Sequence, residues 1–228
     1  MFPIFLKTLF GIMMLPMAVG VMGAFANMVS EMSIFSGMLG TLEKGVLCYL
    51  LFHIFIARPV YIYVLGHEVV HVLATWICGG KVTSFKVSPA GGNVVTSKTN
   101  FFIELSPYFV PLYTVLIVPI FVMLRYFEKG GPHLSEIFLF MVGVTLTFHF
   151  VMTFEILKAQ QQDIAKSGAI FSLVTILIAN IIVITAVFSP FFDQISFVGF
   201  IKDSASRSVG IYQTIYYKIT GLVDYFRS

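Results

Sequence analysis

The sequence predicts an all-α polytopic membrane protein with about five transmembrane helices and one small β-hairpin. The first observation is composition: 58% of the residues are hydrophobic, only 11% are charged, and the mean hydropathy is +0.94. Soluble domains carry about a quarter charged residues. The second observation is that apolar runs long enough to cross a bilayer recur along the chain. The third is a change from a helical to an alternating pattern directly after residue 80.

Five segments are expected to cross the membrane, because about 20 apolar residues span the hydrocarbon core. A longer apolar region, residues 44–78, is interrupted by Arg58-Pro59, and proline kinks or ends a helix. Its main crossing is expected from residue 59 onward, with residues 46–57 re-entrant or partly peripheral. If residues 46–57 crossed alone, there would be six spans. The predicted spans are residues 8–29, 59–78, 106–127, 135–157 and 168–192.

The first span could also be read as a signal peptide, because Lys7 precedes it and Ala24-Phe25-Ala26 is typical of a cleavage site. We favour an uncleaved span, since the run is longer than a typical signal core. Lysines gather on the side where Cys78 emerges, so the positive-inside rule makes that side cytoplasmic. We expect a multi-pass protein of the bacterial cytoplasmic membrane. The lysines on that side are Lys7, Lys81, Lys86, Lys98, Lys158 and Lys166.

Two parts of the chain differ in character, a membrane-embedded domain (residues 1–192) and an amphipathic C-terminal tail (residues 193–228). In the tail, apolar residues recur at helical spacing beside Lys218 and Arg227. This pattern is typical of a helix that lies in the membrane interface, and packing on the helical bundle is the alternative. The apolar stripe consists of Ile211, Ile215, Ile219, Leu222 and Phe226.

His67, Glu68 and His71 form a His-Glu-x-x-His motif inside an apolar segment. Residues four apart share a helix face, so both imidazoles can bind one metal ion. Glu68 lies beside them, where a carboxylate can take a proton from a metal-activated water. Ionisable groups inside a membrane are costly and usually mark function. The motif therefore predicts a Zn²⁺ site, with His67 and His71 as ligands and Glu68 as general base; the alternative is structural use of three paired polar residues.

A catalytic zinc usually takes a third protein ligand. Asp163, His149 and Glu155 are the candidates, because the predicted span at 135–157 runs back toward the face where the motif helix ends. Counted from the membrane face where both predicted spans end, His149 would lie roughly 13 Å deep and His71 roughly 10 Å deep. These similar depths permit contact between the two side chains. Glu104 is a weaker candidate and is expected to be a solvated carboxylate. His53 and His133 are expected to lie outside the site.

The segment after Gly79-Gly80 alternates polar and apolar residues, turns at residues 89–93 and restarts at Val94. We expect a small hairpin beside the metal site. Its exposed edge, with Asn93, Val94 and Val95, could bind an extended substrate peptide by strand addition. The alternative is a loop that only covers the site.

These residues resemble the site-2 protease family of intramembrane zinc metalloproteases. The resemblance rests on GHEVVH in a membrane helix, the Gly-Gly end, the following AGGN segment and later spans, and it covers roughly residues 59–180. It implies that His67 and His71 bind zinc, that Glu68 is the base, and that a later aspartate completes the site. The family's Asn-x-x-Pro-x-x-x-Leu-Asp-Gly motif is absent, and Asp163 is the nearest substitute. The chain has no room for an inserted PDZ domain, so substrate selection would fall to the membrane domain or to a regulatory membrane partner.

We therefore expect an intramembrane zinc endopeptidase that hydrolyses a peptide bond in or near a transmembrane segment of a membrane protein substrate within the lipid bilayer. One alternative is a catalytically inactive protease-like scaffold or subunit of a membrane complex. A weaker alternative is a transporter that uses His149 and Glu155 as a relay. Nucleic acid is not an expected partner, because the basic residues are scattered and the net charge is only +3.

Overall fold

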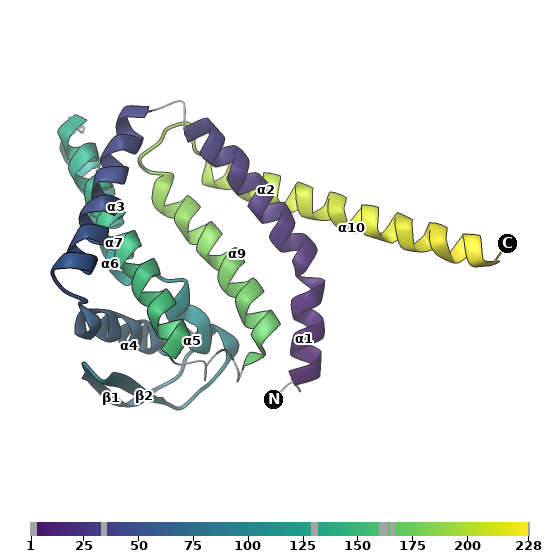
Figure 1. The fold of residues 1–228 in the computed structure, drawn as a ribbon, viewed down its shortest axis with the longest axis horizontal. Helices are drawn as coiled ribbons and strands as arrows, with labels where there is room; N and C mark the ends of the chain where they lie inside the picture. Colours follow the sequence, from purple (N-terminus) through teal and green to yellow (C-terminus); the bar gives the residue numbers. More distant parts are fainter. Residues whose placement is uncertain (1–3, 33–35, 129–131, 160–163, 165–166, 228) are drawn as a thin grey trace. The chain divides into compact units, whose positions relative to one another are not determined.

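The protein folds into helices and one small antiparallel sheet in a computed structural model that describes residues 4–32, 36–128, 132–159, 164 and 167–227 (Figure 1). This confirms the predicted helical fold class with its hairpin. The helices are α1 (Ile4–Met13), α2 (Leu15–Met32), α3 (Ser36–Phe55), α4 (Val60–Ile77), α5 (Phe101–Leu105), η1 (Ser106–Tyr108), α6 (Leu112–Glu128), α7 (Pro132–Ala159), α9 (Ala169–Phe188) and α10 (Phe197–Arg227), and the strands are β1 (Val82–Ser88) and β2 (Gly91–Thr96).

Among the described residues, four helices are long and apolar enough to cross a membrane, namely α2, α4, α7 and α9. A fifth span is possible if α5–η1 and α6 are counted together, although they are bent by 76°. The sequence predicted one continuous span over residues 106–127, and the structure breaks it instead. Pro107 and Pro111 lie at the break, where proline removes backbone donors and clashes with the preceding turn.

The first predicted span is also divided. Residues 8–29 were expected to form one helix, whereas α1 ends at Met13 and α2 begins at Leu15. Pro16 is the second residue of α2, a position that tolerates proline because the first helical N–H groups have no intrahelical partner. The break therefore lies where the sequence places this proline.

Residues 46–57 were expected to be re-entrant or partly peripheral. Most of them form the C-terminal part of α3, a helix of 20 residues that is not among the described helices long and apolar enough to cross a membrane, so that expectation stays a prediction. This helix packs closely along α7 (Figure 1). A β-carbon at Gly143 would lie 2.5 Å from the Leu42 carbonyl oxygen and 3.2 Å from the Gly45 α-carbon. The two helices approach this closely because glycine faces glycine, as in many membrane helix pairs.

The chain divides into two compact units, a terminal unit (Met1–Ile34 and Gly168–Ser228) and a central unit (Phe35–Ser167). In the terminal unit, α1 and α2 pack on α9, and α2 also packs on α10. Small residues again permit the contact, because Gly20 on α2 lies directly against the Ser208 backbone on α10. The central unit contains the His-Glu-x-x-His helix, the hairpin, and helices α3, α5, α6 and α7.

Helix α10 covers most of the predicted C-terminal tail. Its first half packs on α2 through Phe200, Ser204 and Ser208, which are buried, and Tyr212 donates a hydrogen bond to the Met13 carbonyl at 2.5 Å. From residue 213 onward nearly every side chain is exposed. The first half of α10 thus packs on another helix, which was the alternative prediction for the tail. That the second half lies in the membrane interface stays a prediction.

Helix α4 ends where the sequence predicted, at Gly79-Gly80. Gly79 has a φ of +67°, a left-handed conformation that glycine adopts readily. Its N–H donates to the Trp76 carbonyl at 2.9 Å, and the Gly80 N–H donates to the Thr75 carbonyl at 2.8 Å. This bonding pattern is the Schellman motif. It turns the chain directly into β1, so the hairpin follows α4 without a long linker.

Candidate metal centre

His67 and His71 lie next to each other on α4, as their helical spacing requires. Their ring centroids are 4.9 Å apart and the ring planes are 77° apart. His67 also meets the ring of Tyr108 edge to face, with centroids 5.3 Å apart. Two imidazoles are therefore held together inside a helix that is otherwise almost wholly apolar.

The His71 ring is fixed by a backbone contact. Its Nδ1 lies 2.7 Å from the Ile103 carbonyl oxygen, and only a protonated Nδ1 can donate to a carbonyl. The proton on Nδ1 leaves the Nε2 lone pair as the ligating group. Metal-binding histidines commonly donate their second N–H to a carbonyl in this way.

Glu68 is 7% exposed and lies under the hairpin. A β-carbon at Gly92 would lie 2.6 Å from Glu68 Oε1 and 2.7 Å from its Cδ. Strand β2 thus passes directly over the carboxyl group, and only glycine leaves room for it. The hairpin and the motif glutamate, which are about 24 positions apart in the sequence, form one site.

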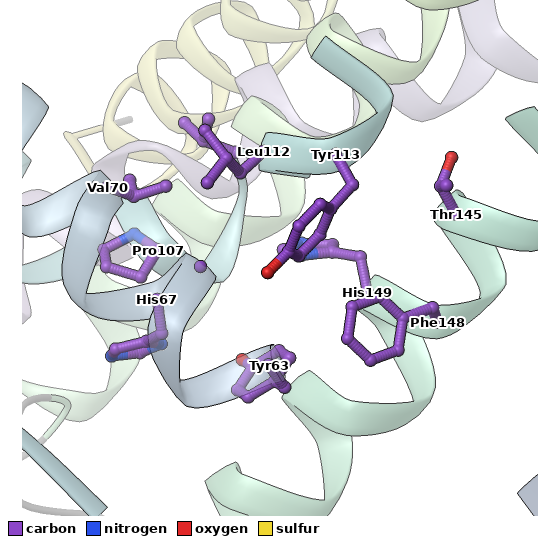
Figure 2. Close-up of a pocket in the computed structure, with 11 residues that line it drawn as sticks. Tyr63, His67, Val70, Pro107, Leu112, Tyr113, Thr145, Phe148 and His149 are labelled. Atoms are coloured by element: carbon purple, nitrogen blue, oxygen red, sulfur yellow. The ribbon is translucent and has the colours of Figure 1, made fainter. Parts of the chain in front are cut away.

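His149 reaches the same region from α7. A small cavity of about 10 Å³, roughly the volume that one water needs, is lined by His149, His67, Tyr63 and Tyr113 among other residues (Figure 2). His149 is 6% exposed and hydrogen-bonded to the backbone of Tyr108. Its Nε2 and the Nδ1 of His67 are buried without a hydrogen-bond partner among the described residues. His149 therefore lies near His67, as depth along the predicted spans allowed.

The short segment α5–η1 contacts all three histidines, which sequence reasoning did not anticipate. Ile103 binds His71 through its carbonyl, and Tyr108 touches His67 with its ring and His149 with its backbone. Two prolines in an apolar run were the signal that could have revealed it, because broken helices in membrane proteins occur where they line a site.

The remaining candidates lie elsewhere. Asp163 is outside the described residues. The carboxylate of Glu155 lies 3.3 Å from His53 Nε2 and 3.6 Å from Arg58 Nη1 at the end of α3. His133 is exposed and pairs with Glu136 at 3.8 Å. In the structure Glu155 thus has partners other than the motif histidines.

Glu104, expected to be a solvated carboxylate, instead accepts a hydrogen bond from the hydroxyl of Ser167. Ser167 is fully buried and Glu104 is half-buried. Because Glu104 follows Ile103 directly, this contact fixes the chain at Ser167 to the same short helix that holds His71.

The predicted substrate-binding residues lie on β2, which pairs only with β1 among the described residues. Asn93 is opposite Lys86, Val94 opposite Phe85, and Val95 opposite Ser84. Asn93 and Val95 are exposed and Val94 is half-buried. The edge of β2 that faces away from β1 is the edge available to an added strand.

No group of three or more His, Cys, Asp or Glu residues close enough to hold a metal ion occurs within the described ranges. Two features of these ranges still suit zinc. Imidazoles at i and i+4 are typical zinc donors, and the His71 ring is already oriented by its carbonyl partner. In addition, Nδ1 of His67 and Nε2 of His149 are buried without a hydrogen-bond partner among the described residues. Buried polar atoms of this kind usually bind a ligand or a water molecule.

Comparison of the chain with models of known protein families, with curated proteins and with solved structures found no match.

Proposed function

We propose that this protein is an intramembrane zinc metalloprotease that hydrolyses a peptide bond in or near a transmembrane segment of another membrane protein. The observation that supports this most strongly is the position of strand β2 against Glu68. An extended strand edge and a buried carboxylate beside two imidazoles are the parts that peptide hydrolysis needs in one place. The resemblance to site-2 proteases implies the same arrangement.

In this proposal His67 and His71 hold the metal, and Glu68 accepts a proton from water and passes it to the leaving amine. Zinc, when bound, supplies Lewis-acid activation of water and of the scissile carbonyl. Asp163 is the proposed third ligand, as the resemblance implies, with His149 as the alternative.

The proposed substrate is an extended peptide that pairs with the open edge of β2. A helical transmembrane segment must unwind before its amide can reach Glu68, and strand addition at Asn93, Val94 and Val95 would hold it unwound. Alternate side chains of such a peptide would face α4 and the opposite side. The backbone pairing would provide affinity, and the side chains that face α4 would provide selectivity.

The proposal places the protein in the membrane through α2, α4, α7, α9 and the broken α5–α6 pair. The number and apolarity of these helices support a multi-pass protein. The distribution of lysines favours a site that opens toward the cytoplasm. A bacterial cytoplasmic membrane and a regulatory membrane partner belong to the same proposal.

The test is cleavage of fluorescently labelled casein by purified protein in detergent, with zinc content measured on each sample. Glu68→Gln should keep zinc and lose about 10²–10⁴-fold in rate, since general-base catalysis contributes that much. Glu136→Gln is the matched control, because Glu136 lies on α7 beside His133 and is 58% exposed. Equal cleavage by Glu68→Gln and wild type would contradict the proposal. Zinc binding without cleavage in wild type would favour the inactive scaffold.

A further inference from the structure

Asn100 connects the C-terminal end of the motif helix to the short helix whose carbonyl holds His71. It immediately precedes α5, a helix of five residues. A helix this short does not hold its shape alone, because helix formation has a costly nucleus. The position of Ile103, whose carbonyl holds His71, therefore depends on the contacts that α5 makes, among them those at its start.

Asn100 supplies those interactions. Its side-chain oxygen accepts a hydrogen bond from the Ile103 N–H at 2.9 Å, which is the usual N-cap geometry. Its backbone is extended, with φ of −151° and ψ of 171°. Ile103 is thus bonded on both sides: its N–H to Asn100, and its carbonyl to Nδ1 of His71 at 2.7 Å.

The same side chain also reaches back to α4. The amide nitrogen of Asn100 donates to Cys78 Sγ at 3.4 Å, and Cys78 is the C-cap residue of the helix that carries His71. Lys98 adds a second link, from its Nζ to the Cys78 carbonyl at 3.0 Å. These contacts close a loop of bonds that runs from His71 along α4 to Cys78, then through Asn100 to Ile103 and back to His71.

We propose that Asn100 is a positioning residue for the metal centre: it caps α5, and thereby places the Ile103 carbonyl that orients the His71 ring. This inference rests on the proposed function. It assigns a role to an exposed polar residue that lies outside the His-Glu-x-x-His motif. Groups that orient a metal-binding histidine typically change metal affinity about 10–100-fold when they are removed.

The test is zinc affinity, measured by competition with a chromogenic chelator on purified full-length protein. Asn100→Ala should weaken zinc binding about 10–100-fold. Asn100→Asp keeps the capping oxygen, replaces the donor to Cys78 with a charged carboxylate oxygen, and should restore affinity to within about three-fold, because Asp caps helices as well as Asn. Ser88→Ala is the matched control: Ser88 is exposed and bonds the Gly91 carbonyl at 2.9 Å within the hairpin turn.

Wild type and His71→Ala are measured in the same titration. If wild type binds no zinc, the proposed function fails and this inference with it. If wild type binds zinc and Asn100→Ala binds it equally well, the inference alone is overturned. Weak zinc binding by both Asn100→Ala and Asn100→Asp also overturns the inference. Loss of the helix cap could then not explain the weaker zinc binding, because Asn100→Asp keeps the capping oxygen. If Asn100→Ala is too unstable to purify, Asn100→Gly removes the same side chain at a position where glycine is better tolerated.

Discussion

The backbone of β2 at Gly92 lies directly on the side chain of Glu68, with no space for a β-carbon between them. This contact joins the hairpin to the motif helix at the residue proposed to act as the base. Because the carboxyl group is buried, the strand restricts both its position and its contact with water. In the proposed function Gly92 therefore acts through this contact, although glycine carries no chemistry of its own.

Gly92→Ala should disturb this contact and lower stability by about 1–3 kcal/mol, the usual range for an overpacked site. For a chain of this size that corresponds to a fall in the apparent melting temperature of roughly 2–12 °C. Thermal unfolding in detergent measures it. Gly221→Ala is the control, because nothing lies within 4 Å of a β-carbon at that helical position. A melting temperature for Gly92→Ala equal to that of Gly221→Ala would show that the hairpin does not press on Glu68.

Gly143→Val should separate α3 from α7. The added side chain would meet the backbone of α3 at Leu42 and Gly45, and backbone atoms cannot rotate away. We expect a loss of at least about 1–3 kcal/mol. Gly40→Ala, on α3 but with nothing within 4 Å of its β-carbon position, should be neutral or slightly stabilising. Equal unfolding curves for the two variants would contradict the close packing of these helices.

The hydrogen bond between Tyr63 and Thr153 should couple α4 to α7. The two hydroxyl oxygens are 2.9 Å apart and buried. Tyr63→Phe and Thr153→Val each remove one partner, and a double-mutant cycle isolates the interaction. We expect a coupling energy of about 0.6 kcal/mol, with an upper limit near 1.7 kcal/mol, as for similar bonds in membrane proteins. Strictly additive effects would mean that the bond does not contribute.

The sequence was sufficient for the apolar helices α4, α7 and α9, for the helix end at Gly79-Gly80 and for the hairpin, because each depends on local pattern and composition. It was not sufficient for the break between Tyr108 and Leu112, although Pro107 and Pro111 signalled it, because both prolines lie in a run apolar enough to be read as one span. The contacts of Glu104 with Ser167 and of Glu155 with His53 depend on tertiary packing. Neither pair has a spacing that helix or strand periodicity could reveal.

Glu155→Gln should leave zinc content unchanged, because Glu155 lies beside His53 and Arg58 rather than beside the motif histidines. The loss of the charge should lower the melting temperature, since the hydrogen bond of the buried His53 and the ion pair of Arg58 would both lose their carboxylate. Elemental analysis together with thermal unfolding tests both parts. Loss of zinc in this variant would instead place Glu155 among the metal ligands, and the contacts at the end of α3 would not describe the metal-bound protein.

The proposed metal centre is tested by the zinc content of purified wild-type protein compared with His71→Ala, measured by elemental analysis after exhaustive dialysis. We expect one zinc per chain in wild type and a large loss in His71→Ala, with both proteins folded. His133→Ala is the matched control, because this histidine is exposed and its partner is Glu136. Wild-type protein without zinc, or His71→Ala with as much zinc as wild type, would show that His71 does not hold a zinc ion.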